Sequence, residues 1–432
     1  MSGQKPREIA VRILKRHAEG QQFIEEILEE EFAGAHLQPA DRRLVQELAF
    51  GVVRWQATLD WLIAERTKGR TQKTVLQILL RLGLYQMFWL DRIPDHAAVH
   101  ETVQMAKETG FGPQSGFINA VLRGYLRERE TIEKRLQLLK HENPSLGFSH
   151  PPWLCERWEK RWGAEVLQKL LEWNNTPPIT FARANTLRTT VENLAAVWEK
   201  EGVRFVPRQF DWVTGDLVFE LRSHPPLVEM PSFQQGLFYV QDPSTLLAVT
   251  FMAPQPGEAI LDLCSAPGGK TTFIAQLMND RGLIMAQDPH MLRRKMVEEN
   301  CQRLGVTSVR IAAPAEGVNP QLSTPYDRVL VDAPCSNTGV LRRRVDLRWR
   351  IQEAEIQRLA RRQLDLLESA AKEVRPGGIL VYSTCSVEPE ENEHVVAKFV
   401  EAHKHFALEE ERMLLPFNDG VDGAYVARLR RT

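Results

Sequence analysis

The chain is 432 residues long, more than one ordinary hydrophobic core requires, so we expect two or three domains. Its formal net charge of -1 excludes a bulk attraction to nucleic acid, and any such binding must come from local basic patches. Five cysteines without a C-x-x-C pair argue against a disulfide framework or a zinc ribbon, and no metal site is expected. The sequence shows no signal peptide and no apolar stretch of membrane-spanning length, which predicts a cytoplasmic protein with no membrane partner.

The first part of the chain, residues 6–126, has helical periodicity throughout. Apolar residues recur at helical spacing, for example Leu59, Leu62 and Ile63. Strand-like alternation is absent, and a proline- and glycine-containing stretch follows. The pattern predicts an all-α domain over residues 1–140.

The next segment, residues 145–233, mixes helix and strand. Its pattern predicts helices at Trp153–Trp173 and Val191–Glu201, and strands at Thr180–Ala184 and Leu217–Leu221. This order is typical of a small open-faced α+β domain, a shape that RNA-binding modules often have.

The last part, residues 234–432, alternates regularly between short apolar runs and helical stretches. We expect buried strands at Ala259–Leu263, Leu283–Gln287, Val309–Ala312, Arg328–Val331 and Ile379–Tyr382. Such alternation is the signature of a Rossmann-like α/β fold with a doubly wound parallel sheet. Ligands of these sheets bind at the carboxyl edge of the strands.

A glycine-containing turn follows the first of these strands. Residues 261–272 read L-D-L-C-S-A-P-G-G-K-T-T, and Gly268 and Gly269 let the backbone approach a ligand closely at a helix start. The spacing matches neither a P-loop nor G-x-G-x-x-G. Asp288 ends the next strand, where an acid typically binds ribose hydroxyls. A single ribose without a pyrophosphate loop favours S-adenosylmethionine; alternatively, the glycines only turn the chain and Asp288 caps a helix.

Two cysteines stand in similar settings further along. Cys335 lies in D-A-P-C-S and Cys385 in S-T-C-S, and each follows an apolar run that predicts a buried parallel strand. Both thiols are therefore expected at the carboxyl edge of the sheet. Two thiols beside a cofactor loop suggest covalent catalysis.

Three long motifs in order make the chain similar to the Sun superfamily of RNA cytosine-C5 methyltransferases: A-P-G-G-K-T-T, D-A-P-C-S-x-T-G-V and S-T-C-S-x-x-P-E-E-N. Further matches are V-Q-D-P-S at 240–244 and D-G-V-D-G at 419–423. The helical part resembles the NusB antitermination-factor domain in L-G-L-Y-Q, I-P-D-H-A-A-V and F-I-N-A-V-L-R, which start at residues 82, 93 and 117. A NusB-like domain joined to this catalytic domain is the arrangement of the bacterial ribosomal RNA small subunit methyltransferase B group.

The resemblance implies a role for each site residue. Cys385 is the nucleophile that adds to C6 of cytosine, and Cys335 assists product release, whereas DNA cytosine-C5 methyltransferases attack with a P-C motif cysteine. Asp332 contacts the methionine end of the cofactor or the cytosine edge, or accepts the proton. Lys270 orients a carboxylate or favours the Cys385 thiolate, unless it is simply solvated. The residues expected at the cofactor are Cys264, Ser265, Ala266, Pro267, Gly268, Gly269, Lys270, Asp288, Arg293 and Asp332.

The implied function is formation of 5-methylcytosine in small-subunit ribosomal RNA by a monomer, with the cytosine called 967 in 16S RNA as the usual site. Two alternatives remain: the same chemistry on another RNA such as tRNA, and a non-catalytic RNA-binding ribosome assembly factor. The sequence departs from the family pattern twice. Ala312–Ala315 lack the acid that usually contacts adenine, with no carboxylate until Glu316, and Val345 replaces a usual proline.

A basic cluster with an interleaved tryptophan follows the catalytic loop. Phosphate neutralisation and an aromatic ring for stacking are what single-stranded RNA binding needs, although charged segments are often merely solvated. In the small domain, F-A-R-A-N matches a family motif that touches RNA or the domain interface. The expected RNA-binding residues are Arg342, Arg343, Arg344, Arg348, Trp349, Arg183 and Asn185.

Overall fold

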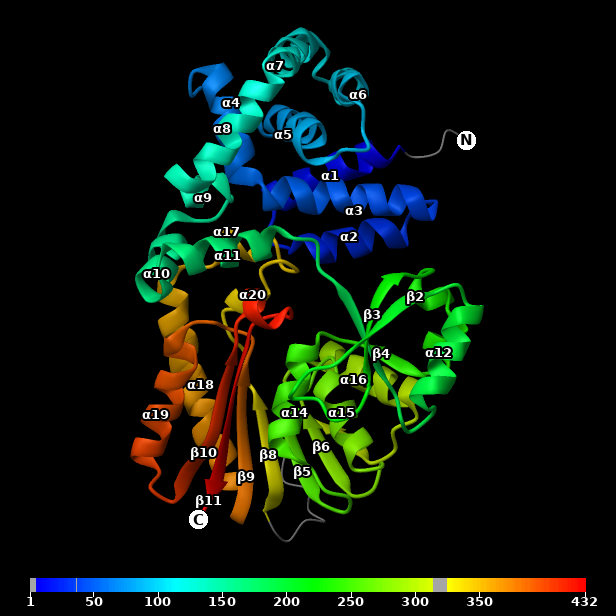
Figure 1. The fold of residues 1–432 in the computed structure, drawn as a ribbon, viewed down its shortest axis with the longest axis vertical. Helices are drawn as coiled ribbons and strands as arrows, with labels where there is room; N and C mark the ends of the chain where they lie inside the picture. The colour runs from blue at the N-terminus through cyan, green and yellow to red at the C-terminus, as the bar shows by residue number, and fades with distance from the viewer. Residues whose placement is uncertain (1–4, 36, 314–324) are drawn as a thin grey trace. The chain divides into compact units, whose positions relative to one another are not determined.

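The chain divides into two compact units (Figure 1). The helical unit comprises residues 1–176 and 341–351, and the sheet unit comprises residues 177–340 and 352–432. No described helix is long and apolar enough to cross a membrane. The computed structural model describes residues 5–35, 37–313 and 325–432.

The helical unit confirms the all-α character expected for the first part of the chain. Its described elements are α1 (Pro6–Glu19), α2 (Ile24–Ala33), α3 (Pro39–Arg54), α4 (Gln56–Thr67), α5 (Thr74–Trp89), α6 (Asp95–Glu108), η1 (Gly112–Gln114), α7 (Ser115–Arg127), α8 (Arg129–Glu142), α9 (Pro144–Gly147), α10 (Pro152–Trp162), α11 (Ala164–Asn175) and α17 (Leu347–Arg350).

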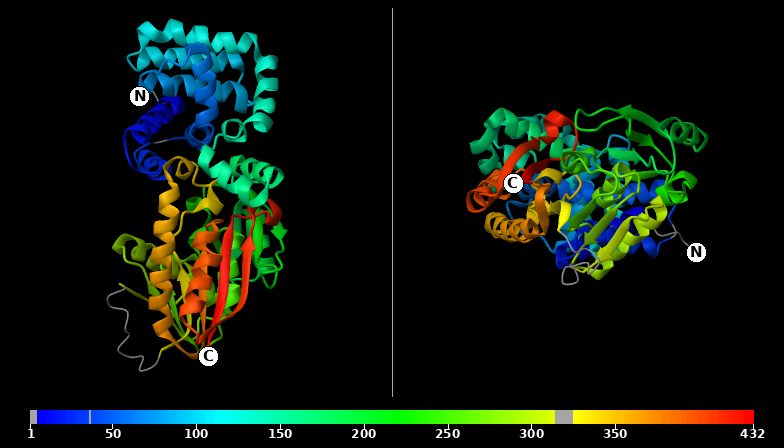
Figure 2. Two further views of the ribbon diagram at one scale, coloured as in Figure 1. Left: turned by 90° about the vertical axis from the view of Figure 1, so that its left-hand side faces the viewer. Right: turned by 90° about the horizontal axis from the view of Figure 1, so that it is seen from below.

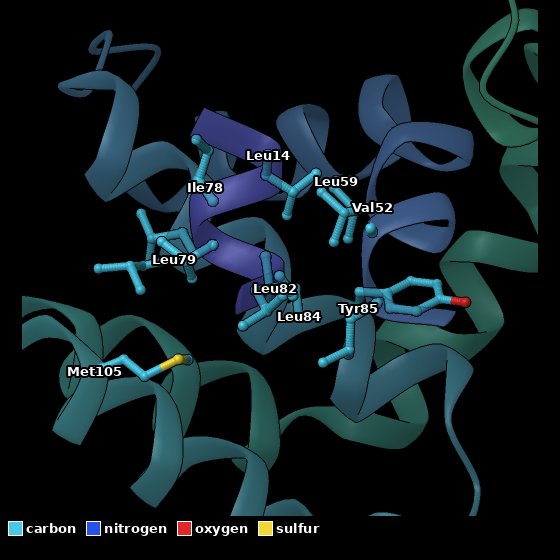
Figure 3. Close-up of a cluster of buried hydrophobic side chains, with 14 of the residues drawn as sticks. Leu14, Val52, Leu59, Ile78, Leu79, Leu82, Leu84, Tyr85 and Met105 are labelled. Atoms are coloured by element: carbon cyan, nitrogen blue, oxygen red, sulfur yellow. The ribbon is translucent and has the colours of Figure 1, made fainter. Parts of the chain in front are cut away.

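Helix α5 contributes much of this unit's core. Ile78, Leu79 and Leu82 recur at helical spacing and are buried among side chains from α1, α3 and α4 (Figure 3). Burial of each such side chain stabilises the fold by about 1.5–3 kcal/mol. On α3, Gly51 lets the ring of Tyr85 approach, because a Cβ atom there would lie 2.0 Å from the ring. The apolar spacing visible in the sequence thus becomes one continuous core.

The expected single helix Trp153–Trp173 is wrong: the segment forms two helices, α10 and α11. Gly163 separates them with φ 81 and ψ 168, a conformation that a helix interior does not have and that glycine adopts readily. Both helices lie in the helical unit.

Segment Leu341–Ile351 also belongs to the helical unit, although it is more than 160 residues further along the chain than the rest of that unit. Val345 is fully buried in the same hydrophobic core. Trp349 donates a hydrogen bond from Nε1 to the carbonyl oxygen of Val53 at 2.9 Å. The segment that directly follows the Cys335 loop is therefore anchored among the N-terminal helices.

The smaller sheet of the sheet unit and the helices beside it have the expected α+β character. The sheet is antiparallel, in the order β2-β3-β1-β4. Trp198 packs edge-on against Phe219 and Phe238 and centres its core. The elements are β1 (Thr180–Ala184), α12 (Val191–Lys200), β2 (Arg204–Arg208), β3 (Val218–Ser223), η2 (Leu227–Glu229), α13 (Pro231–Gln234) and β4 (Phe238–Val240), the last lying beyond the expected boundary at residue 233.

The larger sheet has the order β10-β11-β9-β8-β5-β6-β7, and strands β5 to β9 are parallel within it. Its strands are β5 (Ala259–Leu263), β6 (Leu283–Gln287), β7 (Val309–Ala312), β8 (Tyr326–Asp332), β9 (Val374–Thr384), β10 (Phe406–Leu414) and β11 (Ala424–Arg431). The remaining elements are η3 (Pro243–Thr245), α14 (Leu246–Met252), α15 (Gly269–Leu277), α16 (Met291–Leu304), η5 (Thr338–Val340), α18 (Glu353–Glu373), η6 (Pro389–Glu391), α19 (Glu393–Ala402) and α20 (Pro416–Asp419).

The Rossmann-like fold is confirmed and the five expected strands are parallel, but the sequence did not predict β10 and β11, which form an antiparallel hairpin on β9. Strand β10 is at the sheet edge and most of its residues are exposed. Its acidic residue Glu409 forms cross-strand ion pairs with Arg428 and Arg430 of β11. Such a charged edge strand lacks the apolar run that revealed the central strands.

Alternate residues of the central strands face opposite sides of the large sheet. On β5, Ile260 packs with residues of α14 and α15, whereas Leu261 packs with residues of α18 and α19. The left view of Figure 2 shows α18 and α19 side by side over one face. The chain runs from β5 to β6 and β7 on one side and returns to β8 on the other, so a ligand crevice is expected at the carboxyl ends of β5 and β8.

Candidate active site

The loops that leave β8 and β9 carry two cysteines whose sulfur atoms lie 3.2 Å apart. Strands β8 and β9 pair in parallel up to Asp332 and Ser383, so both chains leave the sheet at the same edge. Cys335 is buried, whereas Cys385 is partly exposed. The structure thus brings the two expected catalytic cysteines together and leaves Cys385 the more accessible.

The protonation of Cys335 is set by its partner and by burial. Its hydrogen bond with Cys385, its burial and the charges of Cys385 and Glu391 all raise the pKa of the Cys335 thiol well above the ordinary value. Cys335 therefore keeps its proton at neutral pH and presents an S–H donor toward the sulfur of Cys385.

Lys270, the first-turn lysine of α15, is not the solvated lysine that the sequence left open. Its Nζ lies 2.8 Å from Oδ2 of Asp332. Burial alone would lower the pKa of Lys270, but the charge of Asp332 and its hydrogen bond, with smaller contributions from Cys385 and Asp262, raise it overall. The pair places a fixed cation and a carboxylate beside the thiols.

A second carboxyl group lies close to this pair. Asp262 on β5 is fully buried and accepts a hydrogen bond from Thr271 Oγ1 at 2.6 Å. Burial, reinforced by the charge of Asp332, raises the pKa of Asp262 to about 7, although the Thr271 hydrogen bond and Lys270 oppose the shift. The site therefore holds one carboxyl group that is ready to exchange a proton near neutral pH.

The residues present fit the ribose end of S-adenosylmethionine. Asp288 is fully buried at the end of β6; its Oδ1 accepts the His290 N–H at 2.9 Å, while its Oδ2 has no hydrogen-bond donor among the described residues. An acceptor left over at this position suits a ribose hydroxyl. Gly268, with φ 101, is the N-cap residue of α15. Arg293 links the strand end to the glycine-containing loop. Its Nη1 lies 3.5 Å from Oδ2 of Asp288, and its Nη2 donates a hydrogen bond to the Ala266 carbonyl at 3.1 Å.

Replacing Asp288 by alanine is expected to weaken S-adenosylmethionine binding about 10- to 100-fold, because a hydrogen bond to a charged group contributes about 1.5–3 kcal/mol. Isothermal titration of the purified protein measures this. Glu299→Gln is the control, because this acid lies on the following helix α16, is exposed and forms an ion pair with Lys295. Equal affinities in the Asp288→Ala and control proteins would contradict the assignment.

The adenine end is only partly within the described residues. Strand β7 ends at Ala312, and Ala313 follows it without a carboxylate. Glu316, the first acid after this strand, lies outside the described residues.

The expectation that Arg342 and Arg348 bind RNA conflicts with their burial. Arg348 is fully buried and donates to Asn175 Oδ1 at 2.9 Å and to two carbonyl oxygens of the helical unit, those of Asn174 and Ser149. Arg342 is buried over the ring of Trp173, 4.2 Å from its centroid. A phosphate cannot reach either guanidinium in this conformation, because protein atoms surround both.

The other members of the cluster differ in exposure. Trp349 is half-buried and its indole N–H is already bonded to Val53. Arg343 is half-buried, and Arg344 is exposed. Arg344 is thus the cation of this segment with the best access to an RNA phosphate.

Arg183 and Asn185 hold the two sheets of the sheet unit together rather than facing solvent. Arg183 is buried and donates to Gln241 Oε1 at 2.7 Å and to the Gly269 carbonyl at 3.1 Å. Asn185 donates to the carbonyls of Gly236 and Leu304 at 2.8 and 2.9 Å. Of the two roles that the motif suggested, these contacts support the domain interface.

Two residues that sequence reasoning missed contact the two cysteine loops. Asn337, the variable position of D-A-P-C-S-x-T-G-V, accepts a hydrogen bond from Cys385 Sγ at 3.0 Å and donates to the Cys335 carbonyl at 2.7 Å. Its φ of 58 lies in the left-handed region, which asparagine tolerates better than most residues. Glu391 of the P-E-E-N motif is buried behind both loops. The motif itself was visible in the sequence, but its contacts were not.

Three family models match consecutive parts of the chain. They are described as the NusB family (residues 4–127), the RsmF/B-like ferredoxin-like domain (150–211) and the 16S rRNA methyltransferase RsmB/F (249–430). Among curated relatives, the probable ribosomal RNA small subunit methyltransferase B of Synechocystis is 36% identical, over 91% of this chain and 92% of its own. The protein of the same description from Bacillus subtilis is 31% identical, over 98% of both chains.

Solved structures share the same architecture. The crystal structure of PH0851 matches with a TM-score of 0.79 and 25% identity, over 99% of both chains. NSun6 from Pyrococcus horikoshii, solved with the S-adenosylmethionine analogue SFG, matches with a TM-score of 0.56 and 25% identity, over 65% of this chain and 98% of its own.

Proposed function

Because the chain belongs to the 16S rRNA methyltransferase RsmB/F family of S-adenosylmethionine-dependent enzymes, we propose that it methylates C5 of a cytosine in small-subunit ribosomal RNA through a covalent cysteine adduct. The observation that carries the proposal is the pair of thiols, 3.2 Å apart, beside Lys270 and Asp332 at the cofactor crevice. One thiol is enough for the attack on cytosine, and the neighbouring thiol lies where it can assist the departure of the attacking sulfur. The usual family site, cytosine 967 of 16S RNA, is the proposed target.

The chemistry begins at Cys385. Its thiolate adds to C6 of the cytosine, which forms a carbon–sulfur bond and makes C5 nucleophilic. When bound, S-adenosylmethionine would supply the electrophilic methyl group, whose bond to the sulfonium sulfur would break as C5 bonds to it and leave a neutral thioether. Asp332, held in place by Lys270, accepts the proton that C5 then loses, and the electron pair breaks the bond between C6 and sulfur.

Cys335 assists that last step. A departing thiolate is a better leaving group when a hydrogen-bond donor faces it, and a charge-assisted hydrogen bond is about twice as strong as a neutral one. The protonated Cys335 presents such a donor to Cys385. The two cysteines therefore divide attack and release between them.

Bisulfite sequencing of RNA from a strain without the gene tests the target. One cytosine of 16S RNA, position 967, is expected to lose its protection from conversion, because 5-methylcytosine resists bisulfite, and the wild-type gene is expected to restore it. Loss of protection in a tRNA instead would support the alternative RNA substrate. An unchanged pattern would support a non-catalytic assembly factor and contradict the proposal.

A further inference from the structure

A buried carboxylate, that of Glu391, lies between the two cysteine loops without touching either sulfur. Glu391 is fully buried on η6. Its Oε1 accepts the backbone N–H of Ser336 at 2.8 Å and Nε2 of Gln363 at 2.9 Å. Its Oε2 accepts the hydroxyls of Ser336 and of Ser386, the latter at 2.5 Å. Four donors thus converge on one acceptor group.

The donors fix which loops the carboxylate joins. Ser336 directly follows Cys335, and Ser386 directly follows Cys385. Only an ionised carboxylate can accept from all four donors, since a protonated acid would set a donor against one of them. Burial raises the pKa of Glu391, although the bonds from Ser336, Ser386 and Gln363 oppose the rise. One buried group therefore accepts hydrogen bonds from the residue that directly follows each cysteine.

The pairing of β8 with β9 cannot set the distance between the sulfurs, because both cysteines lie beyond its last paired residues, Asp332 and Ser383. Other contacts assist, such as the bond from Gly339 N–H to the Cys385 carbonyl at 3.0 Å. The neighbour of Glu391 acts on the same loop: Asn392 accepts from Thr384 Oγ1 at 2.6 Å and donates to the Ser386 carbonyl at 2.9 Å. The turn that contains Glu391 and Asn392 therefore holds the nucleophile loop on both sides of Cys385.

We propose that Glu391 is a positioning residue that sets the spacing of the attacking and releasing thiols, and this inference rests on the proposed function. Through Ser336 and Ser386 the carboxylate ties the two loops together, so that one cytosine ring meets both sulfurs. Misplacement of a reacting group by about 1 Å typically costs about 10²-fold in rate. Removal of the tie is thus expected to slow catalysis while the cofactor loop, which is built from other residues, keeps its affinity.

Glu391→Gln is the sharpest variant. The carbonyl oxygen of the new glutamine can still accept hydrogen bonds from Ser336 N–H and Gln363. Its NH₂ group cannot accept the hydrogen bonds that the hydroxyls of Ser336 and Ser386 donate, and the bond from Ser386 is the link to the Cys385 loop. We expect kcat to fall about 10- to 100-fold, with KM for RNA and S-adenosylmethionine affinity within about two-fold of wild type. Glu390→Gln, a partly exposed acid in the same turn, is the matched control and is expected to behave as wild type.

A second measurement needs neither RNA nor cofactor, so it is independent of whether the proposed methylation is correct. Diamide oxidises two neighbouring thiols to a disulfide and takes up their two hydrogens as it becomes a hydrazine derivative. Mass spectrometry of the Cys335–Cys385 peptide pair follows this reaction. The wild-type and Glu390→Gln proteins are expected to form the disulfide readily, and Glu391→Gln about ten-fold more slowly, since its thiols no longer stay close.

Should Glu391→Gln fail to fold, Ser386→Ala replaces it, because this change removes the hydroxyl that joins Glu391 to the Cys385 loop, together with its contacts to Glu388 N–H, Ser336 Oγ and Thr338 Oγ1. The same slower disulfide formation is expected there. An unchanged diamide rate in the folded variant overturns the positioning role, even if methylation is lost. A rise in KM with unchanged kcat overturns it as well, because that pattern indicates a role in RNA binding.

Discussion

Cys385→Ala is expected to form no covalent RNA adduct and to transfer no methyl group, whereas Cys335→Ala is expected to accumulate the adduct. Without the Cys385 sulfur nothing adds to C6, so the rate should fall at least about 10⁴-fold, as for other lost nucleophiles. Without Cys335 the attack still proceeds, but the departing sulfur loses the S–H donor that lies 3.2 Å away. Denaturing electrophoresis of protein incubated with labelled RNA and S-adenosylmethionine separates these outcomes.

Cys301→Ala is the control for this pair. Cys301 is buried on α16 outside the site, and burial raises the pKa of its thiol to about 12, so it is an inert packing residue. The variant should methylate RNA and release it as wild type does. An adduct that persists in Cys385→Ala, or one absent from Cys335→Ala, would overturn the division of roles.

Asp332→Asn is expected to reduce kcat about 10²- to 10⁴-fold, the usual contribution of a positioned general base. Asparagine cannot accept the C5 proton, so the methylated adduct should persist on Cys385 instead of resolving. The substitution also leaves the buried cation of Lys270 without its carboxylate partner at 2.8 Å. Rapid-quench measurement of methyl transfer and of adduct in one turnover distinguishes blocked release from blocked attack.

The matched control is Asp327→Asn, at the opposite end of the same strand. Asp327 is similarly exposed and likewise paired with a cation, Arg375 at 2.6 Å, but it lies far along β8 from the thiols. It should keep the wild-type rate. If Asp332→Asn turned over as fast as this control, another group would have to accept the proton. Asp262, with a pKa of about 7, would be the best candidate.

Burial of both faces explains why part of the fold could be predicted. The bounds of β5 and β6 agree with the structure at every end, because a parallel strand covered on both sides is a continuous apolar run. The bounds of β7 agree as well, although it is a partly exposed strand at the sheet edge. Strand β10 has no such run, since water covers most of it and Glu409 pairs with arginines of β11. The hairpin it forms was therefore not predicted.

The sequence by itself determined the three kinds of domain and the family, and it predicted the cofactor loop and the pair of catalytic cysteines, because these depend on local spacing and on long motifs. Only the tertiary structure decided which charged side chains are exposed to solvent. Arg344 and Arg348 stand four residues apart in one basic run, yet one is exposed and the other is enclosed by carbonyls of distant helices. Likewise Glu391 reaches Ser336 across 55 residues. Burial and long-range hydrogen bonds arise from the whole packed chain, and no local pattern encodes them.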